Sequence, residues 1–296
     1  MRKANNKQLK RTVFLFVLPA LFIYIAFQII PLFGAMGFSL VSWNGIAGSK
    51  ITFVGLQNYI DAFKNPAFIL SLKNLLRFTV LSVLIHTPIA LLLAVALNAK
   101  IKGYRFFKAL FFVPTVFPLT AIGLMWYFIF MPAGAFNAFL EAVGLGQLAQ
   151  SWLVNAGTAM NTITFVNIWA GVGYYMVILL AGLTTLPTDV YEAAKIDGAT
   201  SVQAFFHITV PLLKPTISMC FLMDIIGTVK VFDLIFAMTG GGPNGLTNLP
   251  TTLMYNEAFK YSHYGMGSAI GMIILIICLV GTLTVNGIMG RKSKED

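Results

Sequence analysis

The chain has 296 residues and a formal net charge of +10; 58% of its residues are hydrophobic, only 10% are charged, and its mean hydropathy is +0.82. This composition excludes most soluble folds, because apolar segments long enough to cross a bilayer fill most of the chain. The positive charge does not indicate a nucleic-acid ligand, because the basic residues sort by the connections between apolar segments.

Six apolar segments of the chain are each about 20 residues long, the length that a helix needs to cross about 30 Å of hydrocarbon. Backbone N–H and C=O groups find no water at that depth, so these segments are expected to be helices. The sequence therefore predicts an all-α, polytopic integral membrane protein with a single domain over residues 1–296. The predicted spans cover about residues 13–33, 75–97, 109–130, 163–183, 217–238 and 269–288.

The first apolar segment follows a basic N-terminus, as in a secretory signal peptide. It runs for about 20 residues, whereas the apolar region of a signal peptide has about 7 to 15, and no clear small-residue cleavage site follows it. We therefore expect an uncleaved first span.

Lysine and arginine residues concentrate in alternate connections, and residues 131–160 contain none. By the positive-inside rule, both termini and the connection at about residues 185–215 are cytoplasmic, and the loop at about residues 240–266 is extracytoplasmic. The basic residues on the predicted cytoplasmic side are Arg2, Lys3, Lys7, Lys10, Arg11, Lys100, Lys102, Arg105, Lys108, Lys195, Lys214, Arg291, Lys292 and Lys294.

The connection between the fourth and fifth spans carries the most specific motif. Glu192-Ala-Ala-Lys-Ile-Asp-Gly198 is followed, after nine residues, by Ile208-Thr-Val-Pro211. This arrangement resembles the EAA loop of binding-protein-dependent ABC importers, with the pattern E-A-A, three residues, G, nine residues and I-x-L-P. Val210 replaces the leucine of that pattern. The alternative interpretation is an ordinary solvated loop.

The residues of this connection can form a helical hairpin. Glycine at position 198 tolerates the left-handed conformation that ends a helix, and Thr200 and Gln203 have the spacing of a capping box that starts the next one. The resemblance implies that the hairpin docks on an ATPase subunit. The residues that it places at this contact are Glu192, Ala193, Ala194, Asp197 and Gly198.

The fourth span contains aromatic, amide and glycine residues suited to a sugar. An aromatic ring presents an apolar face to the C–H surface of a sugar, and an amide can bond its hydroxyl groups. Sugar-permease subunits resemble this chain at Asn167, Trp169, Gly171 and Tyr174, which implies substrate contact. The alternative role for these residues is interfacial anchoring or close helix packing.

The fifth span contains three charged residues, although a charge at that depth costs at least about 2.5 to 3.5 kcal/mol on insertion scales unless it is compensated. Lys230 and Asp233 are spaced i, i+3 on a helix, which predicts a structural ion pair. Asp224 has no such partner nearby in sequence. It shares one predicted helical face with Gly227, Thr228 and Val231, a pattern suited to lining a substrate pathway.

Two further segments resemble sugar permeases of this importer class. One covers residues 14–43 and 53–59 near the N-terminus, and the other is the run KVFDLIFAMTGGGP, which ends at Pro243 and resembles the larger-type, first permease subunit. The resemblance implies that the glycine-rich end of this run lies against a substrate-binding protein. A flexible linker is the alternative.

Several kinds of chemistry have no support in the sequence. There is no nucleotide-binding P-loop and no pair of catalytic carboxylates. His86, His207 and His263 lie in different segments without metal-ligand spacing, and His86 is expected to be a hydrogen-bonded helix residue rather than a proton relay. Cys220 and Cys278 both fall inside spans, which favours packing over a disulfide. We therefore expect no enzyme activity, metal or cofactor in this chain.

The resemblance implies the permease fold and function of a type I ABC importer, located in a bacterial or archaeal cytoplasmic membrane. Its substrate would be a carbohydrate, specifically an oligosaccharide. Its partners would be a second, non-identical permease, two ATPase subunits that bind ATP and Mg²⁺, and an extracytoplasmic substrate-binding protein. The alternatives are a glycerol-phosphate importer, an ion-coupled secondary transporter that uses Asp224 as its ion site, and a membrane enzyme.

Overall fold

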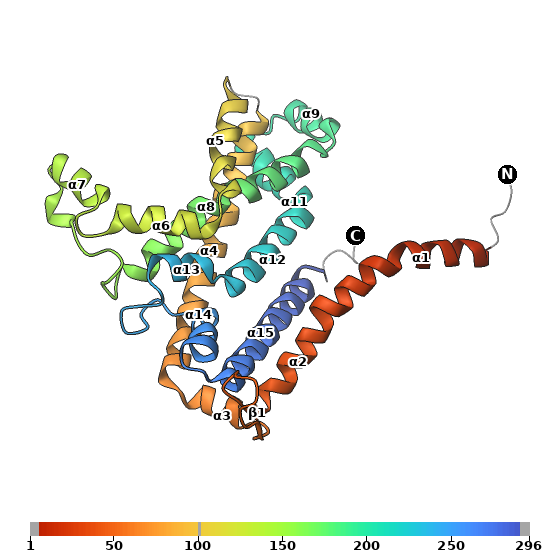
Figure 1. Ribbon diagram of the computed structural model, residues 1–296. Coiled ribbons are helices and arrows are strands. Elements are labelled where there is room, and N and C mark those ends of the chain that lie inside the picture. The colour runs from red at the N-terminus through yellow and green to blue at the C-terminus, as the bar shows by residue number, and fades with distance from the viewer. Residues whose placement is uncertain (1–5, 100–101, 291–296) are drawn as a thin grey trace. The chain divides into compact units, whose positions relative to one another are not determined.

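A computed structural model describes residues 6–99 and 102–290 of the chain (Figure 1). These residues form helices almost throughout, and their only sheet is an antiparallel pair, β1 (Val41–Ser42) and β2 (Thr52–Phe53). The contacts divide the chain into two compact units. Unit 1 holds the residues up to Lys64 together with Met254–Ile273, and unit 2 holds Asn65–Leu253 and the residues from Ile274 onward.

Unit 1 begins with a long apolar helix that continues α1 (Asn6–Tyr24) through a π-helical turn (Ile25–Ile29) into α2 (Ile30–Ser39). The following β-hairpin is fixed by α3 (Gln57–Lys64), because the Asn58 side-chain amide donates hydrogen bonds to the carbonyls of Ser39 and Val41, at 2.8 and 2.9 Å. Trp43 packs against Phe38 and Tyr264. These contacts join the N-terminal segment to the start of α15 (Tyr264–Gly290).

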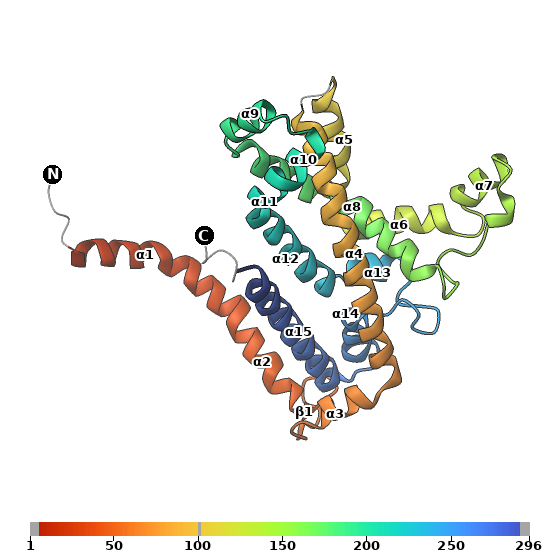
Figure 2. The ribbon, with the colours of Figure 1, turned by 180° about the vertical axis from the view of Figure 1, so that it is seen from behind.

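Unit 2 is built on α4 (Pro66–Asn98) and α8 (Ala159–Thr184), which pack side by side (Figure 2). The helices α5 (Tyr104–Val116) and α12 (Lys214–Lys230) pack against this pair, and their shared core includes fully buried Met176, Leu179 and Leu213. The remaining helices among the described residues are α6 (Leu119–Phe130), α7 (Ala135–Ala142), a 3₁₀ turn (Gly146–Leu148), α9 (Thr188–Ile196), α10 (Ser201–Ala204), a π-helical turn (Phe205–Thr209), α11 (Val210–Leu212), α13 (Asp233–Met238), α14 (Pro250–Tyr255) and a π-helical turn (Asn256–Lys260).

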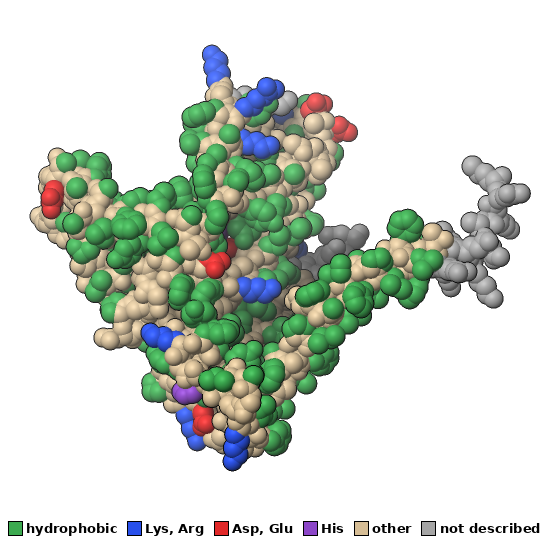
Figure 3. All heavy atoms as spheres, in the orientation of Figure 1, with side chains coloured by type: hydrophobic (Ala, Val, Ile, Leu, Met, Phe, Trp, Pro, Cys, Tyr) green, Lys and Arg blue, Asp and Glu red, His purple; other side chains and the backbone are tan. Residues whose placement is uncertain are grey.

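The outward surfaces of these helices are apolar. Large hydrophobic side chains such as Leu84, Leu92 and Phe128 are more than half exposed, as expected for surfaces that face lipid. Figure 3 shows charged side chains gathered over the end of unit 2 that carries α5 and α9, and mostly hydrophobic side chains along the helices below. Five described helices have the length and hydrophobicity of a membrane span, or six if the bent pair Ser201–Leu212 and Lys214–Lys230 counts as one.

Two of the predicted spans are not continuous helices. The third is broken at Phe117, which precedes Pro118 and takes the extended conformation (φ −82°, ψ 145°) that proline imposes on the residue before it. The fifth is broken after Lys230, where Val231 is extended (φ −60°, ψ 128°) before α13 begins at Asp233. The Thr251 hydroxyl donates to the Val231 carbonyl at 2.6 Å and satisfies one backbone group of this break.

Candidate functional site

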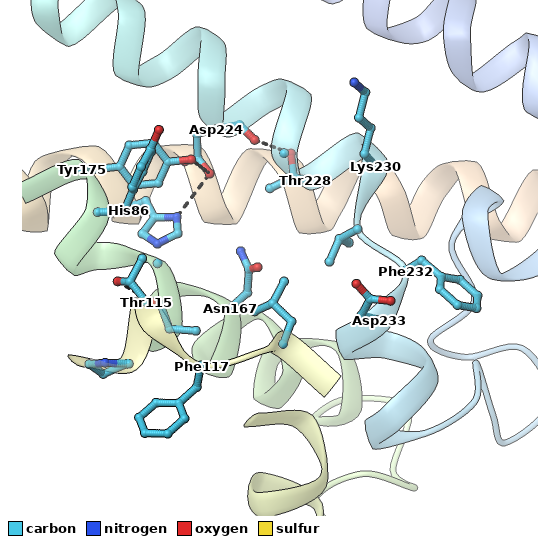
Figure 4. A pocket seen from close by; sticks show the side chains of 17 residues that line it. His86, Thr115, Phe117, Asn167, Tyr175, Asp224, Thr228, Lys230, Phe232 and Asp233 are labelled. Carbon is cyan, nitrogen blue, oxygen red and sulfur yellow. Dashed lines mark hydrogen bonds and ion pairs between the residues drawn. The ribbon is translucent and has the colours of Figure 1, made fainter. Parts of the chain in front are cut away.

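The two helix breaks face a cavity of about 350 Å³ within unit 2, which we call the polar cavity (Figure 4). Non-helical backbone at membrane depth is tolerated only where protein covers it or where it lines a cavity. The cavity therefore explains why the two helices can be interrupted at this depth. The lining residues are His86, Pro114, Thr115, Phe117, Leu119, Asn167, Ala170, Gly171, Tyr174, Tyr175, Asp224, Gly227, Thr228, Lys230, Val231, Phe232 and Asp233.

A buried polar cluster forms one wall of this cavity. The Asp224 carboxylate, from α12, lies 3.2 Å from Nδ1 of His86 on α4 through its Oδ1 atom. The Tyr175 hydroxyl, from α8, donates to the same oxygen at 3.4 Å. The three residues are 2 to 8% exposed. Asp224 therefore has the compensating partner that an acid at this depth requires.

Other polar groups of the cavity are partly committed to the protein. The Asn167 amide donates to the Ser82 hydroxyl at 3.3 Å, and the Thr115 hydroxyl donates to the Ala170 carbonyl at 3.2 Å. The Thr228 hydroxyl donates to the Asp224 carbonyl at 2.9 Å. Tyr174 is 38% exposed and has no described hydrogen bond from its hydroxyl. No group of three or more His, Cys, Asp or Glu side chains within residues 6–99 and 102–290 is placed to hold a metal ion.

Most residues that the sequence assigns to the substrate share this cavity, and Trp169 does not. Asn167, Gly171, Tyr174, Asp224, Gly227, Thr228 and Val231 line it. Trp169 lines a separate apolar groove with Leu81, Phe165 and other residues, and its ring packs edge-on against Trp126. Because Trp169 follows Asn167 by two positions, it points to a different side of α8. The structure therefore places Trp169 and Asn167 beside different cavities.

The predicted ion pair between Lys230 and Asp233 is absent. Two histidine–carboxylate pairs are the only ion pairs formed within the described part of the chain, and neither includes these residues. The helix ends at Lys230 and a new one begins at Asp233, so the i, i+3 geometry of a continuous helix is lost. Figure 4 shows the two side chains pointing in different directions. Both are exposed, which reduces the need for a partner.

Sequence patterns did not identify His86 and Tyr175 as members of the site. The structure confirms that His86 is a hydrogen-bonded helix residue, but its partner Asp224 is 138 positions away in the chain. One signal was available. An intramembrane acid without a local partner requires one elsewhere, and His86 is the one histidine inside a predicted span.

The EAA motif forms a compact helical hairpin, here called the EAA hairpin (residues 188–212). Gly198 has a φ of +76°, which confirms the left-handed turn after α9. The predicted capping box is also formed, with the Thr200 hydroxyl accepting from the Gln203 N–H and the Gln203 side chain accepting from the Thr200 N–H. The Tyr191 and Thr209 hydroxyls lie 3.0 Å apart and tie the two arms together.

The outer surface of the EAA hairpin is exposed and partly apolar. Glu192, Ala193, Asp197 and Gly198 are exposed, and Ala194 is half-buried. Large apolar side chains lie on the same hairpin without cover, namely Ile196, Val202 and Phe206, at 86, 66 and 61% exposure. At its base, Leu213 is 1% exposed and packs into the core of α4 and α8. The hairpin is thus anchored in the helices that build the cavity.

Comparison with known families identifies the chain. The family model described as "Binding-protein-dependent transport system inner membrane component" matches residues 86–292. The chain belongs to this family. The resemblance that the EAA motif indicates is therefore confirmed, and the chain is a multi-pass membrane permease of an ABC importer, a transport subunit rather than an enzyme.

Three of the relatives that match this chain cover nearly its whole length. The probable ABC transporter permease protein YurN of Bacillus subtilis is 37% identical, over 91% of this chain and 93% of the relative. The multiple sugar-binding transport system permease protein MsmF of Streptococcus mutans is 35% identical, over 100% of this chain and 99% of the relative. The trehalose/maltose transport system permease protein MalF of Thermococcus litoralis is 32% identical, over 91% of this chain and 90% of the relative.

Two solved structures share the fold. A chain of a bacterial ABC transporter involved in the import of the acidic polysaccharide alginate has a TM-score of 0.82 at 22% identity, over 96% of this chain and 98% of that chain. A chain of the bacterial alginate ABC transporter in complex with alginate pentasaccharide-bound periplasmic protein has a TM-score of 0.84 at 24% identity, over 97% of this chain and 98% of that chain. These likenesses confirm the all-α fold of a type I importer permease.

Proposed function

We propose that this permease imports a neutral oligosaccharide and that the polar cavity is its substrate site in the membrane. The observation that carries the proposal is the lining of the cavity, where a partly exposed tyrosine ring, an amide and hydroxyl groups share one space with two helix breaks. Its volume of about 350 Å³ lies within the range of about 300 to 1,000 Å³ of ligand pockets. Several relatives are named as permeases for multiple sugars, for trehalose and maltose, or for arabinooligosaccharides, and these names support the proposal.

Three residues would recognise the sugar directly. The exposed ring of Tyr174 can stack on its C–H face, and Asn167 and Asp224 can hydrogen bond its hydroxyl groups. Gly171, Gly227, Thr228 and Val231 would shape the walls. Trp169 is not included, because its ring lies in the other groove.

The charges of the cavity favour a neutral substrate over an anionic one. Asp224 faces His86, and the remaining charged residues of the lining are one lysine, Lys230, and one aspartate, Asp233. A glycerol-phosphate importer would need a basic face that attracts phosphate, and this lining provides no excess of positive charge.

The complete importer would contain this chain as one half of the translocation pathway. Its proposed partners are a second, non-identical permease, two ATPase subunits that hold ATP and Mg²⁺, and an extracytoplasmic substrate-binding protein. Under this proposal the chain itself binds no nucleotide or metal. The basic residues near its ends support a topology with both termini and the EAA hairpin in the cytoplasm.

The EAA hairpin is the proposed contact with an ATPase subunit. Its exposed Ile196, Val202 and Phe206 offer apolar area that a partner protein can cover, next to Glu192, Ala193, Ala194, Asp197 and Gly198. Because the base of the hairpin packs on α4 and α8, a movement of the hairpin would reach the cavity walls.

The glycine-rich loop after α13 is the proposed contact with the binding protein. It is not an unstructured linker, because the Asn74 amide donates to the carbonyls of Gly245, Leu246 and Asn248. Buried Thr247 adds a hydrogen bond from its hydroxyl to the Gly242 carbonyl at 3.0 Å.

Uptake by the purified importer tests the substrate and the site together. Proteoliposomes that contain all subunits should take up labelled trehalose, maltose or an arabino-oligosaccharide only with ATP and binding protein. Tyr174→Ala should weaken uptake by about 5- to 20-fold through the lost ring contact. Val154→Ala, on an exposed loop outside the cavity, is the matched control and should transport normally. Uptake of sugar phosphates alone would overturn the proposal.

Cysteine labelling tests the topology. Single cysteines at positions 147 and 203, in a background without Cys220 and Cys278, should react with an impermeant thiol reagent from opposite sides of the membrane. Reaction of both from the outside would exclude an ATPase contact at the EAA hairpin.

A further inference from the structure

Unit 2 has a second hollow between α4 and α8, separate from the polar cavity, which we call the apolar groove (Figure 2). It has a volume of about 490 Å³. Its lining includes Ile85 and Ile89 of α4 and Phe165 of α8. These three side chains are 38 to 50% exposed, so the groove is open at the surface of unit 2.

The length of the apolar groove matches one leaflet of a bilayer. Its α8 wall runs from Asn161 to Val172, about 16 Å at a helical rise of about 1.5 Å per residue. Half of the hydrocarbon thickness of a bilayer is about 15 Å. Asn161 stands just before the fourth predicted span, at the membrane boundary, and Val172 stands near the middle of that span. One acyl chain therefore fits the groove lengthwise.

The inside of the groove suits a hydrocarbon chain. All of its lining residues except Asn161 and Thr164 are apolar or aromatic. The Thr164 hydroxyl donates to the Met160 carbonyl of its own helix at 2.7 Å, so it is already paired. The Trp169 ring packs edge-on against Trp126, with 5.3 Å between ring centroids. This contact holds the aromatic part of the wall in place.

A fixed arginine stands at the polar end of the groove. The Arg77 guanidinium, from α4, donates to Oδ1 of Asn161 at 2.9 Å, and the Asn161 side-chain nitrogen donates to the Gly157 carbonyl at 3.2 Å. Lys73 precedes Arg77 by one helical turn on the same face of α4. Both cations are exposed, and neither forms an ion pair with any residue that the structure describes.

This pair of cations calls for an anion at the membrane boundary. Arg77 falls inside the second predicted span, where an uncompensated charge is costly. Under the proposed topology this end of α4 is extracytoplasmic, so the positive-inside rule does not account for Arg77 and Lys73. A guanidinium has five N–H donors in a geometry that matches phosphate. A lipid phosphate would supply the missing charge where an acyl chain leaves the groove.

We propose that the apolar groove, Arg77 and Lys73 form a binding site for an anionic phospholipid of the extracytoplasmic leaflet. One acyl chain lies in the groove, and the phosphodiester of the headgroup accepts hydrogen bonds from Arg77, with Lys73 adding a second positive charge. The site is separate from the polar cavity, so the lipid does not compete with the transported sugar.

Photolabelling of the assembled importer tests this site. The importer, with all of its subunits, is placed in phosphatidylcholine nanodiscs that contain a small fraction of phosphatidylglycerol with a photoactivatable acyl chain. Phosphatidylcholine with the same labelled chain replaces it in a parallel sample. Mass spectrometry then gives the labelling yield at residues 81–89 and 161–172. The yield with phosphatidylglycerol should exceed that with phosphatidylcholine by about 5- to 25-fold, because two cations attract the anionic headgroup.

Substitutions of the cations test the headgroup end. Arg77→Gln should lower the ratio of the two yields by about fivefold, and a double Lys73→Gln, Arg77→Gln change should bring it close to one. Arg105→Gln removes an exposed arginine from α5, outside the groove, and is the matched control. It should leave the ratio within about twofold of wild type.

Substitutions of the groove wall test the acyl-chain end. Ile85→Trp fills the groove and should lower the yields of both lipids at least about fivefold, without changing their ratio. Leu84→Trp, at the neighbouring position and 64% exposed but outside the groove, is the matched control and should label normally. Co-purification of the partner subunits shows that each variant is assembled.

Each of three results would overturn the inference. Absence of label from the groove of the wild-type importer would mean that a partner subunit covers it. Equal yields with the two lipids would mean that α4 and α8 present an ordinary lipid-facing surface. A ratio unchanged by Arg77→Gln would remove the headgroup contact. The wild-type comparison needs no variant, so it decides the point even if a substitution prevents assembly.

Discussion

The EAA hairpin is assembled from neighbours in sequence, whereas the polar cavity brings together side chains up to 138 positions apart. In the hairpin, Gly198 and the Thr200–Gln203 box each act within a few residues. In the cavity, the partner of Asp224 comes from another helix, and two helices break at its edge. Substitutions in the hairpin should therefore impair transport through local backbone strain. Substitutions in the cavity should impair it through poorer packing between helices.

The largest effect is expected at the turn of the hairpin. Gly198→Val places a β-branched side chain at φ +76°, which costs about 2 kcal/mol or more, although no atom lies within 4 Å of the new Cβ. Sugar uptake and stimulated ATP hydrolysis should fall at least about 20-fold in an assembled complex. Gly144→Val has the same conformation (φ +78°) and the same open space, but lies after α7, and should transport normally. Equal losses in both variants would remove the special role of Gly198.

A loss of about tenfold is expected from Gly171→Ala in the cavity, because the new methyl group meets the His86 ring at 2.8 Å. Gly227→Ala is the matched change on α12, where no atom lies within 4 Å, and should lower uptake less than about threefold. The test compares the uptake kinetics of the two variants. Basal ATP hydrolysis checks that each complex is assembled. Equal behaviour would mean that the His86 packing does not limit transport.

Thr200→Ala should lower stimulated ATP hydrolysis by about fivefold, because loss of an N-cap oxygen destabilises a helix by about 1 kcal/mol. Thr200→Ser keeps this oxygen and should behave as wild type. If alanine and serine give the same rate, the capping box does not contribute to coupling.

The smallest effect is expected from Lys230→Ala, because Lys230 has no ion pair with Asp233 to lose. The yield of assembled complex should stay within about twofold of wild type. A large drop in assembly, restored by a second Asp233→Ala change, would show that the two residues do pair in the importer.

Local chemistry explains which parts of the fold could be predicted. The all-α class and the number of apolar segments follow from composition and span length, and the EAA hairpin follows from its glycine and capping residues. The ends of the third and fifth spans could not be placed by hydropathy, because Pro118 and the extended Val231 interrupt helices inside apolar sequence. Hydropathy measures transfer into lipid, and it does not register where the backbone leaves the helix.

The sequence by itself determined the apolar helices, the EAA hairpin and most residues on the faces of α8 and α12 that meet the cavity, because these depend on spacing along one helix. Only the tertiary structure decided that His86 compensates Asp224, that Trp169 lies in another groove, and that Lys230 and Asp233 do not pair. Each of these depends on which helix lies opposite a side chain. The packing among α4, α5, α8 and α12 determines which side chains face each other, and the spacing of residues within a single helix does not predict it.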